Sequence, residues 1–311
     1  MSDADHDGLC DSWELQGLEP GGGHANWIPP GATPVHKDLY VTIGGLQGSS
    51  PNPAAIADVV GALTLAPSES LATPNLDHLP GITLHASYGD TTLTPMVLRW
   101  PFWASFDSLK ALSFVSSAER SQYGTEFLAT KDRVSRFCLF ADRLLDGAGE
   151  PRTGKAKNVP CRDFIVALGE AEFLRDKVTK GGTRHQQSST FMHELGHSIG
   201  LRHGGGDDNQ YKPNYRSVMS YIWQLPNALL DPYWKLTYSQ RPFNRLVKSN
   251  VNETQGIGGT PGDQVFVTWF VNNKKSQHRV PEAGATDLNG QNGIETSASC
   301  PYLDAPTDQP Y

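Results

Sequence analysis

The sequence predicts an α+β fold of mixed α/β character, and three observations support this prediction. Up to residue 199, segments in which the polarity of the side chains alternates, as in strands, are interleaved with segments that have the composition of helices. Beyond residue 200 these regular patterns almost disappear. The 31 glycines and 22 prolines indicate many loops, which suits an enzyme with a cleft. At 311 residues, the chain can bury a large core in one or two domains.

The expected elements follow in chain order. Residues 39–43 (LYVTI) alternate and predict a strand. Residues 53–65 begin with proline and are rich in Ala, Val and Leu, which is typical of a helix. The other expected elements are a strand at 81–88, a loop at 93–106, a helix at 108–118, strands at 136–141 and 163–168, a loop with a short edge strand at 146–160, and helices at 186–199 and 244–253.

A metal-binding pattern lies at the end of the expected helix 186–199, where residues 193–203 read HELGHSIGLRH. His193 and His197 are four residues apart, so both imidazoles can reach one ion from one helix face. Gly200 allows the chain to leave the helix and to bring back His203 as a third ligand. Three nitrogen ligands leave the fourth position of Zn²⁺ open, which indicates a catalytic site.

Glu194 lies beside the two helical histidines, where it can take a proton from a zinc-bound water. The alternative is an ordinary helix with surface or core histidines. That alternative does not explain why His, Glu, His, Gly and His follow one another at these intervals. The pattern therefore predicts a zinc hydrolase in which Glu194 is the general base.

The pattern His-Glu-x-x-His-x-x-Gly-x-x-His, followed by residues 217–221 (SVMSY), resembles the metzincin clan of zinc endopeptidases. The resemblance implies that Met219 forms an apolar floor beneath the zinc ligands. It implies that Tyr221 binds zinc at rest and later hydrogen-bonds the tetrahedral intermediate. The alternatives are an ordinary core methionine and a tyrosine that is simply packed. His203 is followed by Gly204, which marks no well-known metzincin family, so the family within the clan stays open.

The resemblance also implies an architecture and an activity. A twisted, mostly parallel sheet with the active-site helix is expected at 36–203, above an irregular lower subdomain at 204–311, with both in one catalytic domain spanning 1–311. The expected activity is peptide-bond hydrolysis by Glu194-assisted attack of a zinc-bound water. A substrate peptide would lie extended against the edge of the sheet. The alternatives are a processing peptidase with one dedicated substrate, a hydrolase of non-protein amides, and a non-catalytic, calcium-dependent binding module.

A second metal pattern opens the chain, within the N-terminal segment 1–35. Residues 3–14 (DADHDGLCDSWE) fit the twelve-residue calcium-loop template, with Gly8 at its sharp bend. The expected Ca²⁺ ligands are Asp3, Asp5, Asp7, the carbonyl of Leu9, Asp11 and Glu14. The alternative is a solvated acidic tail. A weaker match to a calcium loop at 287–295 is explained equally well by an Asn/Gly turn. Calcium would serve a structural role by tying down the N-terminus.

The four cysteines are not spaced like a zinc site. Their even number in an apparently secreted protein favours disulfides, for which we expect Cys138–Cys161 and Cys10–Cys300. The pairing Cys138–Cys161 would join two neighbouring strands, and Cys10–Cys300 would tie the ends of the chain. Free buried thiols are the alternative, because cysteine is often a small core residue.

The charge and hydropathy of the chain limit the classes of partner that we expect it to bind. The net charge of −7 and the lack of a long basic run argue against nucleic acid. No stretch of about eighteen apolar residues is present, which argues against a membrane span. We expect a monomeric, secreted enzyme that acts on a peptide or protein, with its leader absent from this chain.

Overall fold

The computed structural model describes residues 2–67, 73–169, 181–209, 212–226, 232–240, 243, 246, 250–259, 261–271, 274–281, 283–286, 288 and 294–295. Of residues 264–271 and 274–279 it describes the backbone without the side chains. The chain divides into two compact units, Met1–Gly200 and Leu201–Tyr311. The N-terminal segment 1–35 belongs to the first unit.

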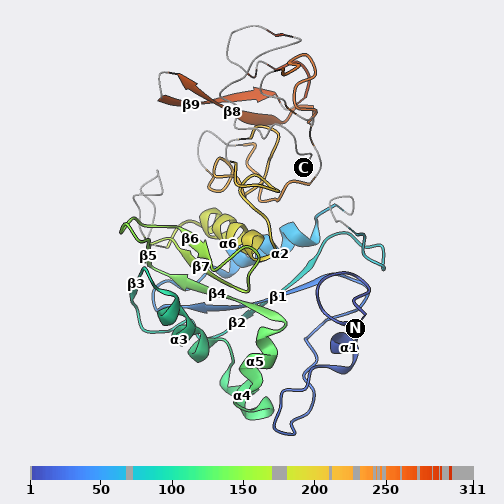
Figure 1. Ribbon diagram of the computed structural model, residues 1–311, viewed down its shortest axis with the longest axis vertical. Coiled ribbons are helices and arrows are strands. Elements are labelled where there is room, and N and C mark those ends of the chain that lie inside the picture. The colour runs from blue at the N-terminus through green and yellow to red at the C-terminus, as the bar shows by residue number, and fades with distance from the viewer. Residues whose placement is uncertain are drawn as a thin grey trace. The chain divides into compact units, whose positions relative to one another are not determined.

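The first unit is built on a five-stranded sheet with the order β2-β1-β4-β7-β6 (Figure 1). β1 (Asp38–Gly45) lies between β2 (Thr83–Tyr88) and β4 (Ser135–Ala141), and β7 (Asp163–Ala167) pairs with β4. These three pairings are parallel, whereas the short edge strand β6 (Gly154–Ala156) is antiparallel to β7. The expectation of a mixed α/β fold with a mostly parallel sheet is confirmed.

Helices cover both faces of this sheet (Figure 1). α2 (Pro53–Thr64) and α6 (Arg184–Ser198) pack on one face. α3 (Trp103–Ser113), α4 (Ser117–Tyr123) and α5 (Phe127–Asp132) lie on the other. All eight residues of β1 are buried, as is typical of a parallel strand covered on both sides.

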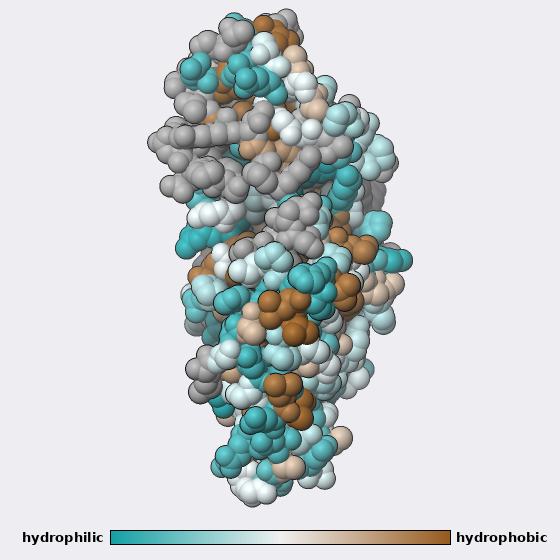
Figure 2. Space-filling model, turned by 90° about the vertical axis from the view of Figure 1, so that its right-hand side faces the viewer, coloured by the Kyte–Doolittle hydropathy of each residue, from teal (hydrophilic) through white to brown (hydrophobic). Residues whose placement is uncertain are grey.

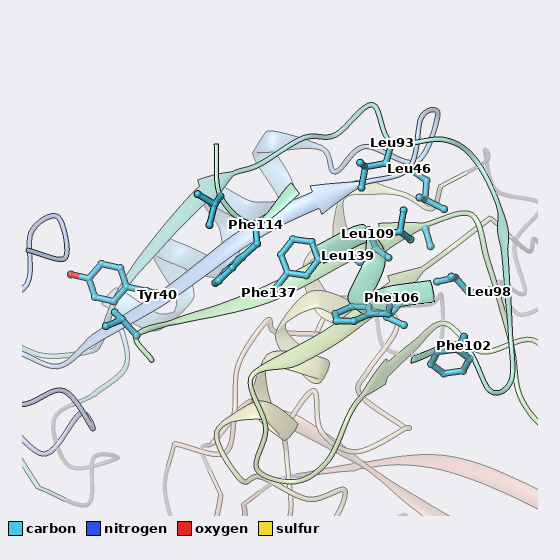
Figure 3. Packing of buried hydrophobic residues seen from close by; sticks show 14 of the residues in the cluster. Tyr40, Leu46, Leu93, Leu98, Phe102, Phe106, Leu109, Phe114, Phe137 and Leu139 are labelled. Atoms are coloured by element: carbon cyan, nitrogen blue, oxygen red, sulfur yellow. The ribbon is translucent and has the colours of Figure 1, made fainter. Parts of the chain in front are cut away.

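The main core cluster lies between the sheet and the α3 side (Figure 3). The Phe137 ring of β4 meets the rings of Phe106 and Phe114 edge-on, with centroids 5.6 and 5.7 Å away. All three side chains are fully buried. Edge-to-face packing of this kind adds about 0.5–1.5 kcal/mol per pair to the free energy gained by burial. This packing holds α3 against the middle of the sheet.

Two predictions between β2 and β4 are wrong in their bounds. The helix expected at 108–118 is instead α3 and α4, separated because Ser116 caps a new helix with Glu119 in a capping box. The loop expected at 93–106 contains β3 (Val97–Arg99), which pairs in parallel with β5 (Arg143–Leu145). A short helix near the N-terminus, α1 (Asp11–Gln16), was also not expected.

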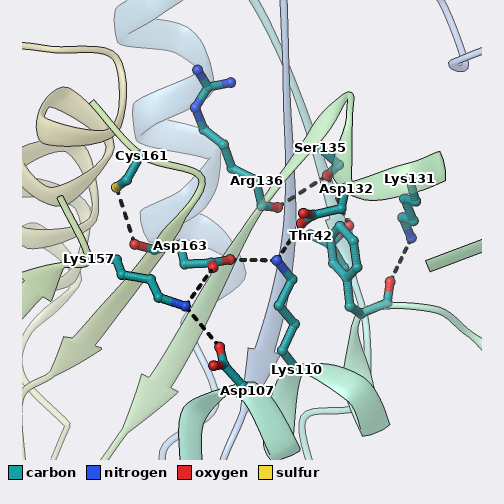
Figure 4. Close-up of polar contacts among 11 residues, drawn as sticks. Thr42, Asp107, Lys110, Lys131, Asp132, Ser135, Arg136, Lys157, Cys161 and Asp163 are labelled. Atoms are coloured by element: carbon teal, nitrogen blue, oxygen red, sulfur yellow. Dashed lines mark hydrogen bonds and ion pairs between the residues drawn. The ribbon is translucent and has the colours of Figure 1, made fainter. Parts of the chain in front are cut away.

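A buried lysine joins three elements beneath the sheet (Figure 4). The Nζ atom of Lys110 in α3 donates to Asp163 at 2.6 Å and also to Asp132. Lys157 adds bonds to Asp107 at 3.0 Å and to Asp163 at 3.5 Å. Asp163 thus has two ammonium partners, and the charge of the buried Lys110 is not left unpaired.

The expected Cys138–Cys161 disulfide is not formed, and both thiols are free. The parallel register places Cys138 opposite Phe164, three residues beyond Cys161. Three strand residues span about 10 Å, which exceeds the Cα separation that a disulfide allows. Cys161 Sγ instead lies 3.3 Å from the carbonyl of Asp163 (Figure 4). The other expected pair includes Cys300, which lies outside the described residues.

In the second unit, the described regular structure is a hairpin of β8 (Gln264–Val271) and β9 (Lys274–Pro281). Most of the helix expected at 244–253 lies outside the described residues, and its described end at 250–253 is not helical. Glu253 is fully buried, and its carboxylate accepts from the amides of Leu288 at 2.7 Å and Glu295 at 3.1 Å. Asp287 and most of the segment 287–295 lie outside the described residues.

Exposed hydrophobic side chains form small separate patches on the face shown in Figure 2. Examples among the exposed residues of the first unit are Leu65, Tyr88 and Trp100. Scattered exposed residues of this kind are normal for a folded chain. None of the helices that the structure describes has the length and apolar composition of a membrane span.

Candidate metal centre

Helix α6 carries the first half of the predicted zinc site. It begins at a capping box, in which the Thr183 hydroxyl accepts from the Gln186 amide and the Gln186 side chain accepts from the Thr183 amide. From Gln186 to Ser198 every residue is buried, although the helix is not apolar. A polar helix that is buried on all sides is unusual for a core element. Its polar residues are therefore candidates for a functional role.

The two histidines of α6 face one another. Their Nε2 atoms are 3.2 Å apart, and their rings are perpendicular, with centroids at 4.7 Å. Two nitrogens bound to one tetrahedral zinc ion at about 2.0–2.1 Å lie about 3.3 Å apart. His193 and His197 are 2 % and 8 % exposed, so water competes little for their nitrogens. The observed spacing fits a shared zinc ion.

The end of α6 is fixed to the sheet by Ser198. The Ser198 carbonyl accepts from the Cys161 amide at 3.2 Å, and the Ser198 hydroxyl accepts from Arg136 Nε at 3.0 Å. Gly200 follows with φ of 103°, a conformation that a side chain would resist. The chain therefore leaves the helix at Gly200 in the manner expected from the sequence.

Glu194 is buried on α6 against the edge strand β6. The amide of Ala156 hydrogen-bonds its carboxylate, and the charge of Lys155 acts on it as well. Burial outweighs both effects and raises the pKa of Glu194 from 4.5 to about 8. Such a carboxyl group is a candidate for proton transfer near neutral pH.

Gly154 is the reason that β6 can approach Glu194 so closely. A methyl group on Gly154 would lie 2.5 Å from Glu194 Oε1 and 2.8 Å from its Cγ. No atom pair of that kind is tolerated without movement of one partner. The sequence predicted an edge strand in this region but did not indicate that Gly154 and Ala156 contact the candidate base. This contact joins residues forty positions apart, so no local pattern could have revealed it.

His203, the expected third ligand, lies just after the end of α6. The candidate ligand nitrogens of His193, His197 and His203 lie within 4.8 Å of one another. A three-histidine cluster that could hold a metal ion is therefore present. His203 sits in a tight turn, in which the Arg202 amide donates to Gly205 at 3.1 Å. Its Nδ1 lies 3.7 Å from Asp208.

The loop that follows His203 is organised by a buried lysine. Lys212 Nζ donates to the carbonyl of Gly204 at 2.8 Å and to Asp207 at 2.7 Å. The side chain of Lys212 is fully buried. A side chain at Gly204 would collide with both Asp207 and Lys212. The glycine at position 204 is thus explained by the close approach of Asp207 and Lys212.

The segment 217–221 forms a tight turn in the second unit. The Ser220 amide donates to the Ser217 carbonyl at 3.0 Å, and the Met219 amide donates to the Ser217 hydroxyl at 3.1 Å. Met219 is fully buried, whereas Tyr221 is 53 % exposed. The Tyr221 ring lies beside the His203 ring, with centroids 4.5 Å apart. The candidate catalytic tyrosine is therefore next to the candidate third ligand.

The N-terminal loop brings acidic side chains together in the first unit. Carboxylate oxygens of Asp3, Asp5 and Asp7 lie within 4.8 Å of one another. The amides of Asp7 and Gly8 donate to Asp3 at 3.2 and 3.1 Å, and Gly8 has φ of 92°. These bonds form the sharp bend that the loop template requires.

The two remaining predicted carboxylates of this loop behave differently. Glu14 gathers with Asp7 and with Asp38 of β1, which the sequence had not suggested. Asp11 instead accepts from the Ala4 amide at 2.9 Å and closes the loop. The side chain of Leu9 is buried in the core, and its amide donates to Asp7 at 2.7 Å.

No protein-family model matches the chain, and no curated protein does so. The roles of the site residues are therefore argued from their geometry and chemistry.

Proposed function

We propose that the chain is a zinc-dependent endopeptidase of the metzincin type. The observation that carries the proposal is the three-histidine cluster with the buried Glu194 beside it on the same helix. Three neutral imidazoles are the donor set that catalytic zinc sites use, and they leave one position for water or substrate. The 3.2 Å spacing of the two helical Nε2 atoms supports this choice of metal.

In this proposal His193, His197 and His203 hold the metal. When bound, zinc acidifies a water molecule and polarises the scissile carbonyl. Glu194 accepts the proton of the attacking water and delivers it to the leaving amine. Glu194 would be kept ionised for this task by the charge of a cation held at the histidines, which would lower its pKa.

Further residues of the chain assist. The Ala156 amide orients the Glu194 carboxylate, and Tyr221 donates a hydrogen bond to the developing oxyanion. Met219 forms an apolar support beneath the metal ligands. A substrate peptide extends along β6, the edge strand that borders α6, by strand addition. A secreted, monomeric enzyme is part of the proposal.

A calcium site in the N-terminal loop completes the proposal. We propose that Asp3, Asp5, Asp7 and Glu14 bind Ca²⁺, which stabilises the fold and takes no part in hydrolysis. Hard carboxylate oxygens around a glycine bend suit this ion.

The proposal is tested by cleavage of a diverse peptide library, analysed by mass spectrometry. The zinc-loaded protein, its Glu194→Gln variant and a sample treated with a zinc chelator are compared, and zinc is returned to the chelated sample. Cleavage only by the metallated wild type, restored on zinc addition, is expected. Cleavage by Glu194→Gln at the wild-type rate would exclude Glu194 as the base. A zinc-loaded wild type that cuts no peptide would favour the dedicated processing peptidase or the non-catalytic binding module.

A further inference from the structure

Five carboxylates meet where the N-terminal loop touches the first strand of the sheet. They form two groups that share one member, Asp3–Asp5–Asp7 and Asp7–Glu14–Asp38. The loop supplies four of them, and β1 supplies Asp38. The local sequence template thus accounts for only part of the cluster.

Two of these carboxylates are buried without partners, which a solvated acidic tail does not explain. Asp5 is 1 % exposed and Glu14 is 4 % exposed. In the described part of the chain, none of their four oxygens has a hydrogen-bond partner. The Asp7 amide lowers the pKa of Asp5, but its hydrogen bond is made to Asp3, at 3.2 Å. Burial of an unpaired carboxylate is costly, so these oxygens favour either a bound cation or a bound proton, and their convergence on further carboxylates favours the cation.

Asp38 is held in a fixed position from both sides. Its Oδ2 accepts from the Thr33 amide at 3.0 Å, and its Oδ1 lies 2.7 Å from His85 Nε2 on β2. The His85 ring is stacked on Tyr40 at 4.3 Å. Each carboxylate oxygen can accept more than one bond, so Asp38 can bind a cation while it keeps these partners.

Two hydrogen bonds, each between a backbone atom and a side chain, also join the loop to the start of β1. The Asp38 amide donates to Asp7 Oδ2 at 2.8 Å, and Lys37 Nζ donates to the carbonyl of Asp5. Both loop residues are therefore positioned by the start of the strand, and not by the loop alone. Lys37 is buried and brings one positive charge to the cluster, which balances only part of the charge of the five carboxylates.

We propose that Asp38 is a calcium ligand supplied by the sheet, which completes the site with Asp7 and Glu14 and anchors the N-terminal loop to β1. The inference rests on the proposed calcium binding and adds the ligand that makes it a tertiary site. Ca²⁺ takes six to eight oxygens at variable geometry, and a cluster of five carboxylates suits it better than Mg²⁺, which retains its water. Asp11, which the loop template places among the ligands, serves instead to close the loop.

The test is a calorimetric titration of Ca²⁺ into protein that has been depleted of metals and then reloaded with zinc. All variants carry Glu194→Gln, so that self-cleavage cannot interfere. Asp38→Asn and Glu14→Gln are each expected to weaken calcium binding at least about tenfold, because affinity follows ligand charge. Asp11→Asn is the matched control and is expected to change affinity less than about threefold. Equal binding by Asp38→Asn and its parent would overturn the inference.

A second measurement covers the case in which Asp38→Asn does not fold. Hydrogen exchange of the unmutated site is followed by mass spectrometry with and without Ca²⁺. Added protection at the Thr33 and Asp38 amides, as well as in residues 3–9, is expected. Protection confined to residues 3–9 would mean that calcium binds without Asp38. No calcium binding by the parent would refute the calcium proposal as a whole, while the peptidase assay of the wild type would be unaffected by that result.

Discussion

Two buried glutamates, Glu194 on α6 and Glu14 on α1, have the same raised pKa of about 8 for different reasons. Burial alone raises the pKa of Glu194, while the Ala156 amide and the Lys155 charge lower it. Burial also leads at Glu14, but the charges of Asp7, Asp5 and Asp38 raise its pKa further. A shifted pKa therefore does not define a function, and the neighbours of the carboxylate do.

Those neighbours support the two different roles that are proposed. Glu194 has a donor that orients it and lies on the helix that carries two of the three clustered histidines, which suits the proposed base. Glu14 stands among other carboxylates with both oxygens unpaired, as a ligand for a hard cation requires. The donor sets differ in the same way, since imidazole suits zinc and carboxylate suits calcium.

The largest expected effect distinguishes the two glutamates. The same substitution, glutamate to glutamine, should have a different result at each position. Glu194→Gln is expected to lower peptide hydrolysis by about 10²–10⁴-fold, because it removes the general base. It should keep both its zinc and its stabilisation by calcium. Glu14→Gln should keep its zinc and lose the calcium-dependent rise in melting temperature. Elemental analysis and melting curves with and without Ca²⁺ check both, and loss of zinc from Glu14→Gln would contradict the separation.

A smaller effect concerns how Glu194 is positioned. Gly154→Ala is expected to lower kcat by about tenfold to hundredfold, since a misplacement of about 1 Å costs on that order. The new methyl group must displace the Glu194 carboxylate or β6. Gly61→Ala in α2 is the matched control, because a methyl group there meets no atom within 4 Å. Kinetics of both variants on one peptide decide the question, and unchanged kcat in Gly154→Ala would mean that the base is not held by β6.

The exposed tyrosine should contribute less. Tyr221→Phe is expected to lower kcat about tenfold with little change in KM, which is the sign of an interaction made in the transition state. The loss is smaller than the 10²–10³-fold of a buried oxyanion donor because half of the Tyr221 side chain faces water. Tyr88→Phe, at a similarly exposed tyrosine on β2, should leave kcat unchanged. An equal loss in both variants would exclude a specific role for Tyr221.

The acidic cluster predicts a pH dependence of stability in metal-free protein. Glu14 has its pKa raised from 4.5 to about 8, and Asp5 has its pKa raised from 3.8 to about 6. A carboxyl group whose pKa is higher in the folded state contributes stability that is complete below its ordinary pKa and is lost as pH rises through the folded pKa. The melting temperature of Glu194→Gln protein should therefore fall between about pH 4 and pH 8, by about 2–4 °C for each kcal/mol lost.

Calcium should remove most of that slope, because a bound cation favours the ionised carboxylates. Melting curves at several pH values, with and without Ca²⁺, test this expectation. The same slope in both series would show that no cation binds at the cluster.

The smallest effect is expected at the free thiols. Cys161→Ser should change the free energy of unfolding by less than about 0.5 kcal/mol, as at an ordinary surface position. Removal of a disulfide would cost about 2–5 kcal/mol. Denaturant titration of the variant distinguishes a free thiol from a disulfide. A loss of about 2–5 kcal/mol in the free energy of unfolding would support the Cys138–Cys161 disulfide.

Features encoded within a few neighbouring residues could be predicted from the sequence. The strand at 39–43 and the helix at 53–65 were found because their patterns repeat along one segment. The residues of the histidine cluster were found because one helix end and one turn hold all of them. The capping box at Ser116 could have located the start of α4, but burial of Phe106 decides where α3 lies.

Features that depend on register or on distant contacts could not be predicted. The Cys138–Cys161 pairing required the β4–β7 register, which no local pattern fixes. Asp38 lies with carboxylates of a loop that ends at residue 14, and Gly154 lies against Glu194 of α6. Each depends on how the chain folds back on itself, so only the structure brings these residues together.

The place of Asp38 has a consequence for the order of folding. With Asp38 as a ligand, as proposed, the loop at residues 3–14 has its full set of oxygens only when it lies against the start of β1, where His85 of β2 contacts Asp38. Unfolded chains should therefore bind calcium weakly, and nearly all of the binding free energy should stabilise the folded state. A cation would then stabilise a sheet whose first strands are already paired. During synthesis, the chain would bind the cation only after at least 88 residues, up to the end of β2, have emerged.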